Sequence, residues 1–220
     1  MTPGRRSAAR ARLPAFARAV ATVGLALLTA YATDRALAQA PDPAKAARLM
    51  DDLMWGRGHV GGPFELIDQT GRTRTDADFQ GKLLILYFGY TYCPDVCPTD
   101  LMQIGLAIDK LGAAGAQVQP LFITVDPERD TPSVLADYVS SFNPRIVGLT
   151  GTPAQVRAVV DAYKAYYAKV FPEGSAIYLI DHTGFIYLMG GSGEYLGFFP
   201  PGTSADRMVE IIRQHLTQRH

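Results

Sequence analysis

The sequence predicts an α/β protein in which helices flank a central mixed sheet. Three observations support this fold class. Continuous apolar runs at 82–90 and 118–125 are typical of strands that are buried on both faces. Segments with helical apolar spacing follow each of these runs. Further β runs on either side of the glycine-rich turn at 190–193 predict a hairpin, and a last helical segment closes the chain.

The expected elements alternate along the chain. Besides the two buried runs, the expected strands are 64–68, which leads into a turn at 69–71, then 146–149, 176–180, 185–189 and 195–199. The expected helices are 41–55, 98–111, 131 to about 142, 152 to about 166, and 204–216. Thr131 and Thr152 each precede a proline, which is the arrangement of an N-cap residue and a proline at the first helical position.

The first 40 residues have the features of an export leader. They contain six arginines and one acidic residue, and their uncharged run from Ala19 to Thr33 precedes an A-x-A cleavage site at 38–40. The run has 15 residues, whereas roughly 17–25 are needed to span hydrocarbon. A cleaved signal peptide and a retained membrane anchor therefore both stay open. We expect a leader or anchor at 1–40, a linker with a juxtamembrane helix at 41–60, and one domain at 61–220.

Charge is distributed unevenly between the leader and the rest. The chain has no net charge, but the residues after position 40 carry 15 basic and 20 acidic side chains. A mildly acidic domain does not favour nucleic-acid binding, which usually needs a basic face. Export would place the domain in the periplasm, either soluble or anchored at the periplasmic face of the bacterial inner membrane, where a disulfide can persist.

The only two cysteines of the chain, Cys93 and Cys97, stand in the stretch GYTYCPDVCPTDL. Pro98 suits the first helical position, which makes Cys97 the expected N-cap and leaves Cys93 in the preceding loop. Both sulfurs would then lie at a helix N-terminus beyond the carboxyl end of a central strand, which is the usual ligand crevice of an open α/β sheet. The helix dipole stabilises thiolate there.

Three roles are open for this pair. A structural disulfide would close only a five-residue loop, and so small a ring adds little stability. Redox catalysis and metal binding both need accessible thiolates, so the cysteines alone do not decide between them.

A metal site needs a further ligand, and a histidine is the natural choice because two thiolates and an imidazole suit Cu(I). His182 lies in YLIDHTGFIYLM between two β runs, so it is either a turn residue or a ligand at a strand end. His59 stands in the glycine-rich entry to the domain, and His215 and His220 fall in the polar C-terminal tail, where we expect exposure. The methionines are scattered and are interpreted as packing residues.

Two acidic residues follow the second buried strand in the stretch TVDPERDTP. If that strand is parallel to the strand before the cysteines, Asp126 lies at the same edge of the sheet. A carboxylate there can orient a histidine or stabilise a cationic metal. The alternative is that Asp126 begins a turn and that Asp130 caps the following helix.

Four stretches together resemble the Sco/SenC family of copper chaperones for cytochrome c oxidase assembly. They are GGPFELIDQTGR, GKLLILYFGYTYCPDVCPTDL, FITVDPERDTP and YLIDHTGFIYLM, in this order. The resemblance implies a thioredoxin-like fold with an N-terminal membrane anchor and a copper site made by Cys93, Cys97 and His182. It matches Asp126 and Asp130 to the two acids of the DPxRD segment. One departure is Tyr92, which stands where many members have a histidine.

The resemblance also implies a function. The chain is expected to be a monomeric copper metallochaperone, rather than an enzyme, that delivers copper to the binuclear site of oxidase subunit II. The Cys93–Cys97 disulfide would be its metal-free, redox-sensitive state. One alternative is a thiol–disulfide oxidoreductase that keeps the oxidase cysteines reduced, with Cys93 attacking and Cys97 resolving. The CxxxC spacing, and Asp181-His182 in place of the proline of thioredoxin-like reductases, count against it. A copper or redox sensor with the same ligands is the other alternative.

Overall fold

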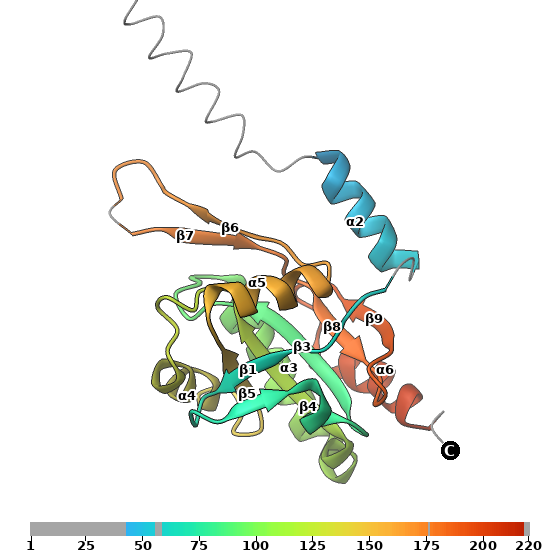
Figure 1. Cartoon of the computed structure of the whole chain (residues 1–220). Helices are drawn as coiled ribbons and strands as arrows, with labels where there is room; N and C mark the ends of the chain where they lie inside the picture. Colours follow the sequence, from blue (N-terminus) through green and yellow to red (C-terminus); the bar gives the residue numbers. More distant parts are fainter. Residues whose placement is uncertain (1–42, 56–58, 176, 218–220) are drawn as a thin grey trace, which may run out of the picture. The chain divides into compact units, whose positions relative to one another are not determined.

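The computed structural model describes residues 43–55, 59–175 and 177–217 (Figure 1). A compact unit spans Arg48–His220. Helix α2 (Pro43–Trp55) accounts for most of the helix predicted at 41–55. The export leader predicted at 1–40 lies outside the described residues. Within the described ranges, no helix has both the length and the apolar character needed to cross a membrane.

A seven-stranded mixed sheet forms the centre of the domain, as predicted, in the order β2-β1-β5-β4-β3-β8-β9. Its strands are β1 (Glu65–Asp68), β2 (Thr73–Thr75), β3 (Leu83–Gly89), β4 (Val118–Thr124), β5 (Val147–Thr150), β8 (Ile186–Met189) and β9 (Tyr195–Phe199). The three central strands β3, β4 and β5 run parallel, and the outer pairs are antiparallel.

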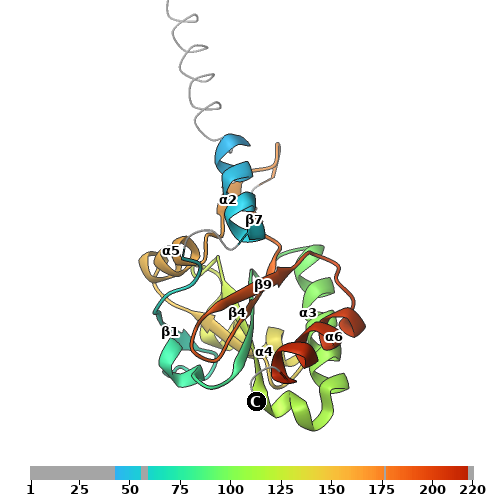
Figure 2. The same cartoon turned by 90° about the vertical axis from the view of Figure 1, so that its right-hand side faces the viewer.

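Helices cover both faces of this sheet (Figures 1 and 2). They are α3 (Val96–Leu111), α4 (Pro132–Ser140), α5 (Pro153–Ala162) and α6 (Ala205–Thr217), with short 3-10 turns at Asp76–Phe79 and Gly112–Gln117. Helices α3 and α6 pack against each other on one face, and α5 lies on the other. The predicted N-caps are confirmed, because the hydroxyls of Thr131 and Thr152 accept hydrogen bonds from the backbone N–H of Val134 and Gln155.

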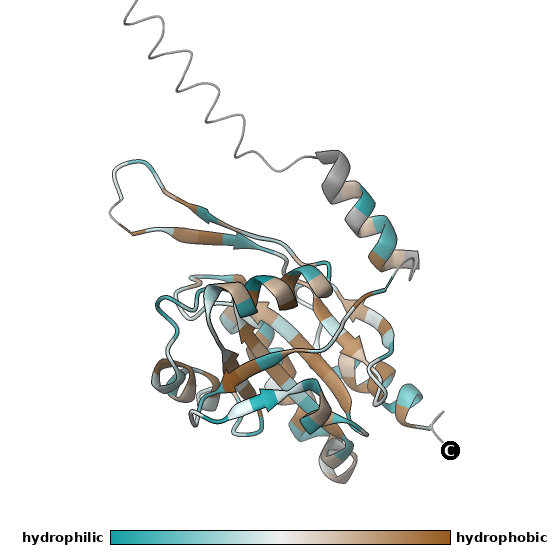
Figure 3. Ribbon diagram, in the orientation of Figure 1, coloured by the Kyte–Doolittle hydropathy of each residue, from teal (hydrophilic) through white to brown (hydrophobic). Residues whose placement is uncertain are grey.

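The two central apolar runs place the functional loops side by side. Every residue of β3 is buried, and the central strands show as brown bands in Figure 3. Strands β3 and β4 pair in parallel from Leu83 with Val118 to Gly89 with Thr124. The loop with the cysteines, which follows β3, and the loop with Asp126, which follows β4, therefore leave the same edge of the sheet, as the sequence predicted.

The start of α3 differs from the prediction. The helix begins at Val96 with Asp95 as its N-cap, so Cys97 and Pro98 lie inside the first turn. A proline is tolerated there because the first four N–H groups of a helix have no partner within the helix. The sulfurs still lie at the helix N-terminus, as expected.

A second, two-stranded sheet is the main feature that the sequence did not predict. Helix α5 ends at Ala162 instead of near 166, because Lys164 adopts a left-handed conformation with φ 55° that turns the chain out of the helix. Strand β6 (Tyr167–Val170) follows and pairs with β7 (Leu179–His182). The strand predicted at 176–180 is thus shifted toward the C-terminus, and its pair β6–β7 forms a hairpin that projects from the domain in Figure 1.

The remaining differences are small. The turn predicted at 69–71 is confirmed by the hydrogen bond that the N–H of Gly71 donates to the carbonyl of Asp68. It leads into β2, which has three residues and was not predicted. The hairpin predicted around 190–193 is confirmed as β8 and β9.

Candidate metal centre

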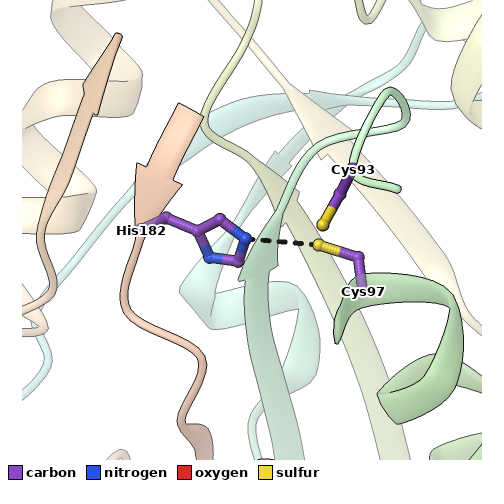
Figure 4. Close-up of side chains that lie close together, drawn as sticks. All are labelled: Cys93, Cys97 and His182. Atoms are coloured by element: carbon purple, nitrogen blue, oxygen red, sulfur yellow. Dashed lines mark hydrogen bonds between the residues drawn. The ribbon is translucent and has the colours of Figure 1, made fainter. Parts of the chain in front are cut away.

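Three side chains that are distant in the sequence converge at one edge of the sheet (Figure 4). Cys93 comes from the loop after β3, Cys97 from the first turn of α3, and His182 from the last position of β7. Their sulfur and nitrogen atoms all lie within 4.8 Å of one another. This is the one such group of potential metal ligands among the described residues. The structure thus brings together the three candidate ligands that the sequence singled out.

The imidazole of His182 presents its unprotonated nitrogen to the sulfurs. Its Nδ1 lies 3.1 Å from the carbonyl oxygen of Thr183, which can only accept a hydrogen bond, so Nδ1 carries the proton. Nε2, which then carries no proton, lies 3.3 Å from the sulfur of Cys97. Edge-on contacts with the rings of Tyr87 and Tyr90 hold the imidazole plane. The tautomer is therefore the one that a metal ligand requires.

The two thiols differ in acidity. The Cys97 thiol donates a hydrogen bond to the sulfur of Cys93 and lowers the pKa of Cys93 to about 4. The backbone N–H groups of Asp95 and Cys97 act in the same direction. The same hydrogen bond and the burial of its sulfur raise the pKa of Cys97. One proton is thus shared by the pair at neutral pH, with the thiolate on half-buried Cys93.

Close packing around Cys97 fixes the position of its sulfur. Cys97 is fully buried, and a side chain at Gly89 would place its Cβ 2.8 Å from that sulfur. One turn further along α3, the buried carboxylate of Asp100 accepts a hydrogen bond from the N–H of Gly202 at 2.8 Å. Burial raises the pKa of Asp100. Neither Gly89 nor Asp100 was identified from the sequence, where nothing distinguishes them from ordinary strand and helix residues.

The two acidic residues of the DPERD segment are buried beside the site but do not touch the ligands in any hydrogen bond. Asp130 accepts hydrogen bonds from the hydroxyl of Thr91 at 2.6 Å and from its N–H at 3.0 Å, and so holds the start of the cysteine loop. The expectation that Asp130 caps α4 is wrong, because Thr131 is the N-cap. Burial raises the pKa of Asp130.

Asp126 does not orient His182 directly. It forms an ion pair with Arg129 and accepts a hydrogen bond from the hydroxyl of Tyr178 at 2.9 Å. Tyr178 lies immediately before β7, the strand that carries His182. The sequence analysis assigned no role to Arg129 or Tyr178. The signal that could have found Arg129 is its place between the two acids of the segment.

The other potential ligands lie elsewhere. His59 is exposed and lines a separate cavity, with a volume of about 210 Å³, beside the 190–193 turn. His215 is half-buried on α6 rather than exposed, and His220 lies outside the described residues. Both cysteines are free thiols in this structure, so the disulfide stays a prediction.

Two of the three candidate ligands, Cys93 and His182, line a shallow groove between the cysteine loop and the β6–β7 hairpin. Its volume is about 300 Å³, and its walls include Tyr90, Pro94, Val170, Leu179 and Ile180. Cys93 and His182 can therefore be reached from the groove, while Cys97 is buried behind them.

The fold and the candidate site together define the class of protein to which this chain belongs. This is a thioredoxin-like α/β protein whose helix N-terminus and hairpin hold a two-cysteine, one-histidine candidate metal centre. The model of the SCO1/SenC family matches residues 54–217, and the chain belongs to this family.

Individual relatives agree with this assignment. The SCO1 homolog 1 of Arabidopsis thaliana mitochondria is 40% identical over 74% of this chain, which spans 49% of that relative. The protein SenC of Rhodobacter capsulatus is 38% identical over 94% of this chain and 90% of its own length. The crystal structure of Arabidopsis thaliana ScoI with copper bound superposes with a TM-score of 0.68 at 40% identity, over 72% of this chain and 99% of that one. The chain thus spans about half the length of its plant relative.

Proposed function

We propose that this protein binds one copper ion through Cys93, Cys97 and His182 and delivers it to the binuclear copper site of cytochrome c oxidase subunit II. The observation that carries the proposal is the convergence of two sulfurs and one imidazole nitrogen within 4.8 Å. Two soft thiolates and an imidazole suit Cu(I), whereas a structural zinc site usually has four ligands. The copper bound in the related Arabidopsis structure supports the same choice of metal.

The protonation states favour uptake of a soft cation. Cys93 supplies a thiolate at neutral pH because its pKa is lowered to about 4. Cys97 loses its proton when the metal arrives, and His182 already offers the lone pair of Nε2. When bound, the copper would be the cargo of the protein.

The open side of the groove supports transfer. Three protein ligands leave a position at which a soft ligand of a partner can bind the copper and then displace the ligands of this chain one at a time. A site that can be reached from one side favours such an exchange over permanent storage.

Copper titration of the purified, reduced chain tests the ligand assignment. We expect one equivalent of Cu(I) per monomer, and weaker binding after Cys93→Ser or His182→Ala. His59→Ala is the matched control, because His59 is exposed and lies outside the ligand group. Wild-type affinity in both ligand variants would refute the assignment.

A second experiment tests delivery. The copper-loaded chain is mixed with a fragment of oxidase subunit II whose cysteines are reduced, and the copper on each protein is measured after separation. We expect transfer to the fragment. Retention of the copper by this chain would contradict delivery but leave copper binding intact.

A thiol–disulfide exchange function is the second candidate, and the lowered pKa of Cys93 favours it. The Cys93 thiolate would attack a disulfide of the partner and release one partner thiolate. Cys97, after losing its proton, would then attack the mixed disulfide, leaving a Cys93–Cys97 disulfide and a second reduced cysteine on the partner. Insulin reduction separates the two ideas, because a reductase should keep its activity after His182→Ala. Loss of copper binding with unchanged reductase activity in His182→Ala would show that copper binding needs the histidine and disulfide exchange does not.

We also propose that the chain is exported and acts in the periplasm, with residues 1–40 as its signal or anchor. The support is the arginine-rich start, the apolar run and the A-x-A site of that segment. Cell fractionation followed by an alkaline carbonate wash tests it: an anchored form stays with the membrane, and a cleaved form is found in the periplasmic fraction. Recovery in the cytoplasm would contradict export.

A further inference from the structure

The strand that carries His182 is not part of the main sheet. Strands β6 and β7 pair only with each other among the strands that the structure describes. An isolated two-stranded hairpin is marginally stable in water. Its backbone ladder fixes the shape of the hairpin but not its distance from the cysteines, which belong to the other sheet and its helix. Residues 183–185 join His182 to β8 of the main sheet, and side-chain contacts hold the rest of the strand that carries it.

Arg129 makes several such contacts. Its Nη1 donates a hydrogen bond to the carbonyl oxygen of Tyr178 at 3.1 Å, and its guanidinium lies 3.8 Å from the centre of the Tyr178 ring. The side chain of Arg129 is 19% exposed, and its partner Asp126 is 1% exposed. Asp126 binds the Tyr178 hydroxyl as well, so one carboxylate joins the arginine and the tyrosine.

The same arginine also faces the cysteine loop. Its guanidinium lies 4.8 Å from the ring of Tyr92, the residue before Cys93, and 5.8 Å from the ring of Tyr90. The hydroxyl of Tyr90 accepts a hydrogen bond from the N–H of Ile180 in β7 at 3.2 Å. The neighbouring Asp130 binds Thr91. One short loop after β4 thus contacts both the segment with the cysteines and the strand with the histidine.

We propose that Arg129, held in place by Asp126, is a positioning residue of the metal centre that fixes the β6–β7 hairpin so that His182 stays at bonding distance from the cysteine sulfurs. This inference rests on the proposed copper binding and goes beyond it. Without the clamp formed by Arg129, Asp126 and Tyr178, the two thiolates still bind Cu(I), but the imidazole no longer reaches it. The clamp therefore sets whether the copper has two protein ligands or three.

A double-mutant cycle tests the proposal in the full chain. Loss of a residue that orients a metal ligand typically lowers metal affinity by about 10- to 100-fold, and we expect a loss of this size for Arg129→Ala. If Arg129 acts through His182, Arg129→Ala in a His182→Ala background should lower the affinity by no more than about twofold. X-ray absorption of the Cu(I) form of Arg129→Ala should show two sulfur ligands and no imidazole.

The controls separate positioning from a general effect on folding. Arg207→Ala removes an arginine and its ion pair with Glu210 on α6, and should leave copper affinity unchanged. Arg129→Lys keeps a positive charge beside Asp126 but cannot make the same planar contacts, so its affinity should lie between those of wild type and Arg129→Ala. Tyr178→Phe removes only the hydroxyl that binds Asp126 and should weaken copper binding by a smaller factor.

Several outcomes would overturn the inference. One is wild-type copper affinity with an intact imidazole signal in a folded Arg129→Ala variant. Another is a loss of affinity in the double variant that equals the product of the fold-losses in the two single variants. If Arg129→Ala does not fold, Tyr178→Phe decides: a loss that disappears in the His182→Ala background supports the clamp, and unchanged affinity refutes it. If His182→Ala alone leaves affinity unchanged, the ligand assignment fails instead, so the two failures are distinguishable.

Discussion

Gly89→Ala is the most direct probe of the packing that fixes the metal ligands. Gly89 ends β3 with a backbone conformation that any residue can adopt, so alanine adds only the bulk of its Cβ. That atom would lie 2.8 Å from the sulfur of Cys97 and 2.8 Å from the ring of Phe122. Packed carbon atoms are normally about 3.5–4.0 Å apart. The sulfur and the buried ring must therefore both move by roughly 1 Å.

The expected cost has two parts. Overpacking of a buried core typically lowers the free energy of unfolding by about 1–3 kcal/mol. For a domain of this size, that change corresponds to a fall in melting temperature of about 2–12 °C. Metal sites tolerate displacements of only about 0.2 Å in ligand distances. The displaced sulfur should therefore lower Cu(I) affinity by at least about tenfold, the lower end of the range for disturbed metal-site geometry.

The assay measures Cu(I) affinity by competition with a chelator and stability by thermal unfolding, on the same preparations. Gly148→Ala is the matched control. Its Cβ would lie 3.2 Å from Leu135 and 3.2 Å from Val139, in the core between β5 and α4 and away from the ligands. We expect it to lower stability without changing copper affinity. Unchanged affinity in Gly89→Ala, or an equal loss in both variants, would refute the reasoning.

Three further predictions follow from the thiols and from Asp130. The pKa of Cys93 is lowered from 9.0 to about 4, so its thiolate persists as the pH falls until that value is approached. Because Cys93 is deprotonated throughout this range, iodoacetamide should label it in the folded chain at a nearly constant rate between about pH 6 and 9. A labelling rate that rises with a midpoint near pH 9 would contradict this. Because only Cys97 keeps its proton at neutral pH, Cu(I) binding at pH 7 should release one proton per copper ion. An indicator dye in weak buffer measures the release. Release of two protons would mean that Cys93 is also a thiol before copper binds. Asp130→Ala leaves the Thr91 N–H and the hydroxyls of Thr91 and Thr124 without their acceptor. It should lower the free energy of unfolding, measured in urea, by about 1.5–3 kcal/mol. Asp137→Ala, at an exposed position, should change this free energy little.

Oxidation of the two cysteines should abolish copper binding. A Cys93–Cys97 disulfide would remove both thiolates, so the oxidised chain should bind no Cu(I) until dithiothreitol reduces it. Mass spectrometry identifies the disulfide, and the titration is repeated on the same sample before and after reduction. Equal copper binding by both forms would show that the cysteines are not the ligands.

The features with local signals could be predicted from the sequence alone. The apolar runs of β3 and β4 are continuous, and a strand buried on both faces needs such a run. Thr131 and Thr152 cap helices because a side-chain oxygen next to a proline satisfies free N–H groups in the first turn. The cysteine pair follows a buried strand directly, so its place at the sheet edge follows from the parallel topology. The family was also recognisable from the order of its motifs.

The contacts between residues that are distant in the sequence could not be predicted and become visible only in the folded chain. The sulfur of Cys97 and Nε2 of His182 are 85 residues apart in the chain and 3.3 Å apart in space. Arg129 reaches the carbonyl of Tyr178 across 49 residues. Neither contact leaves a periodic signal, because apolar spacing reports which face of an element is buried and not which side chain it meets. The end of α5 is a further case, because Lys164 adopts a left-handed conformation just beyond it, where apolar spacing alone would extend the helix.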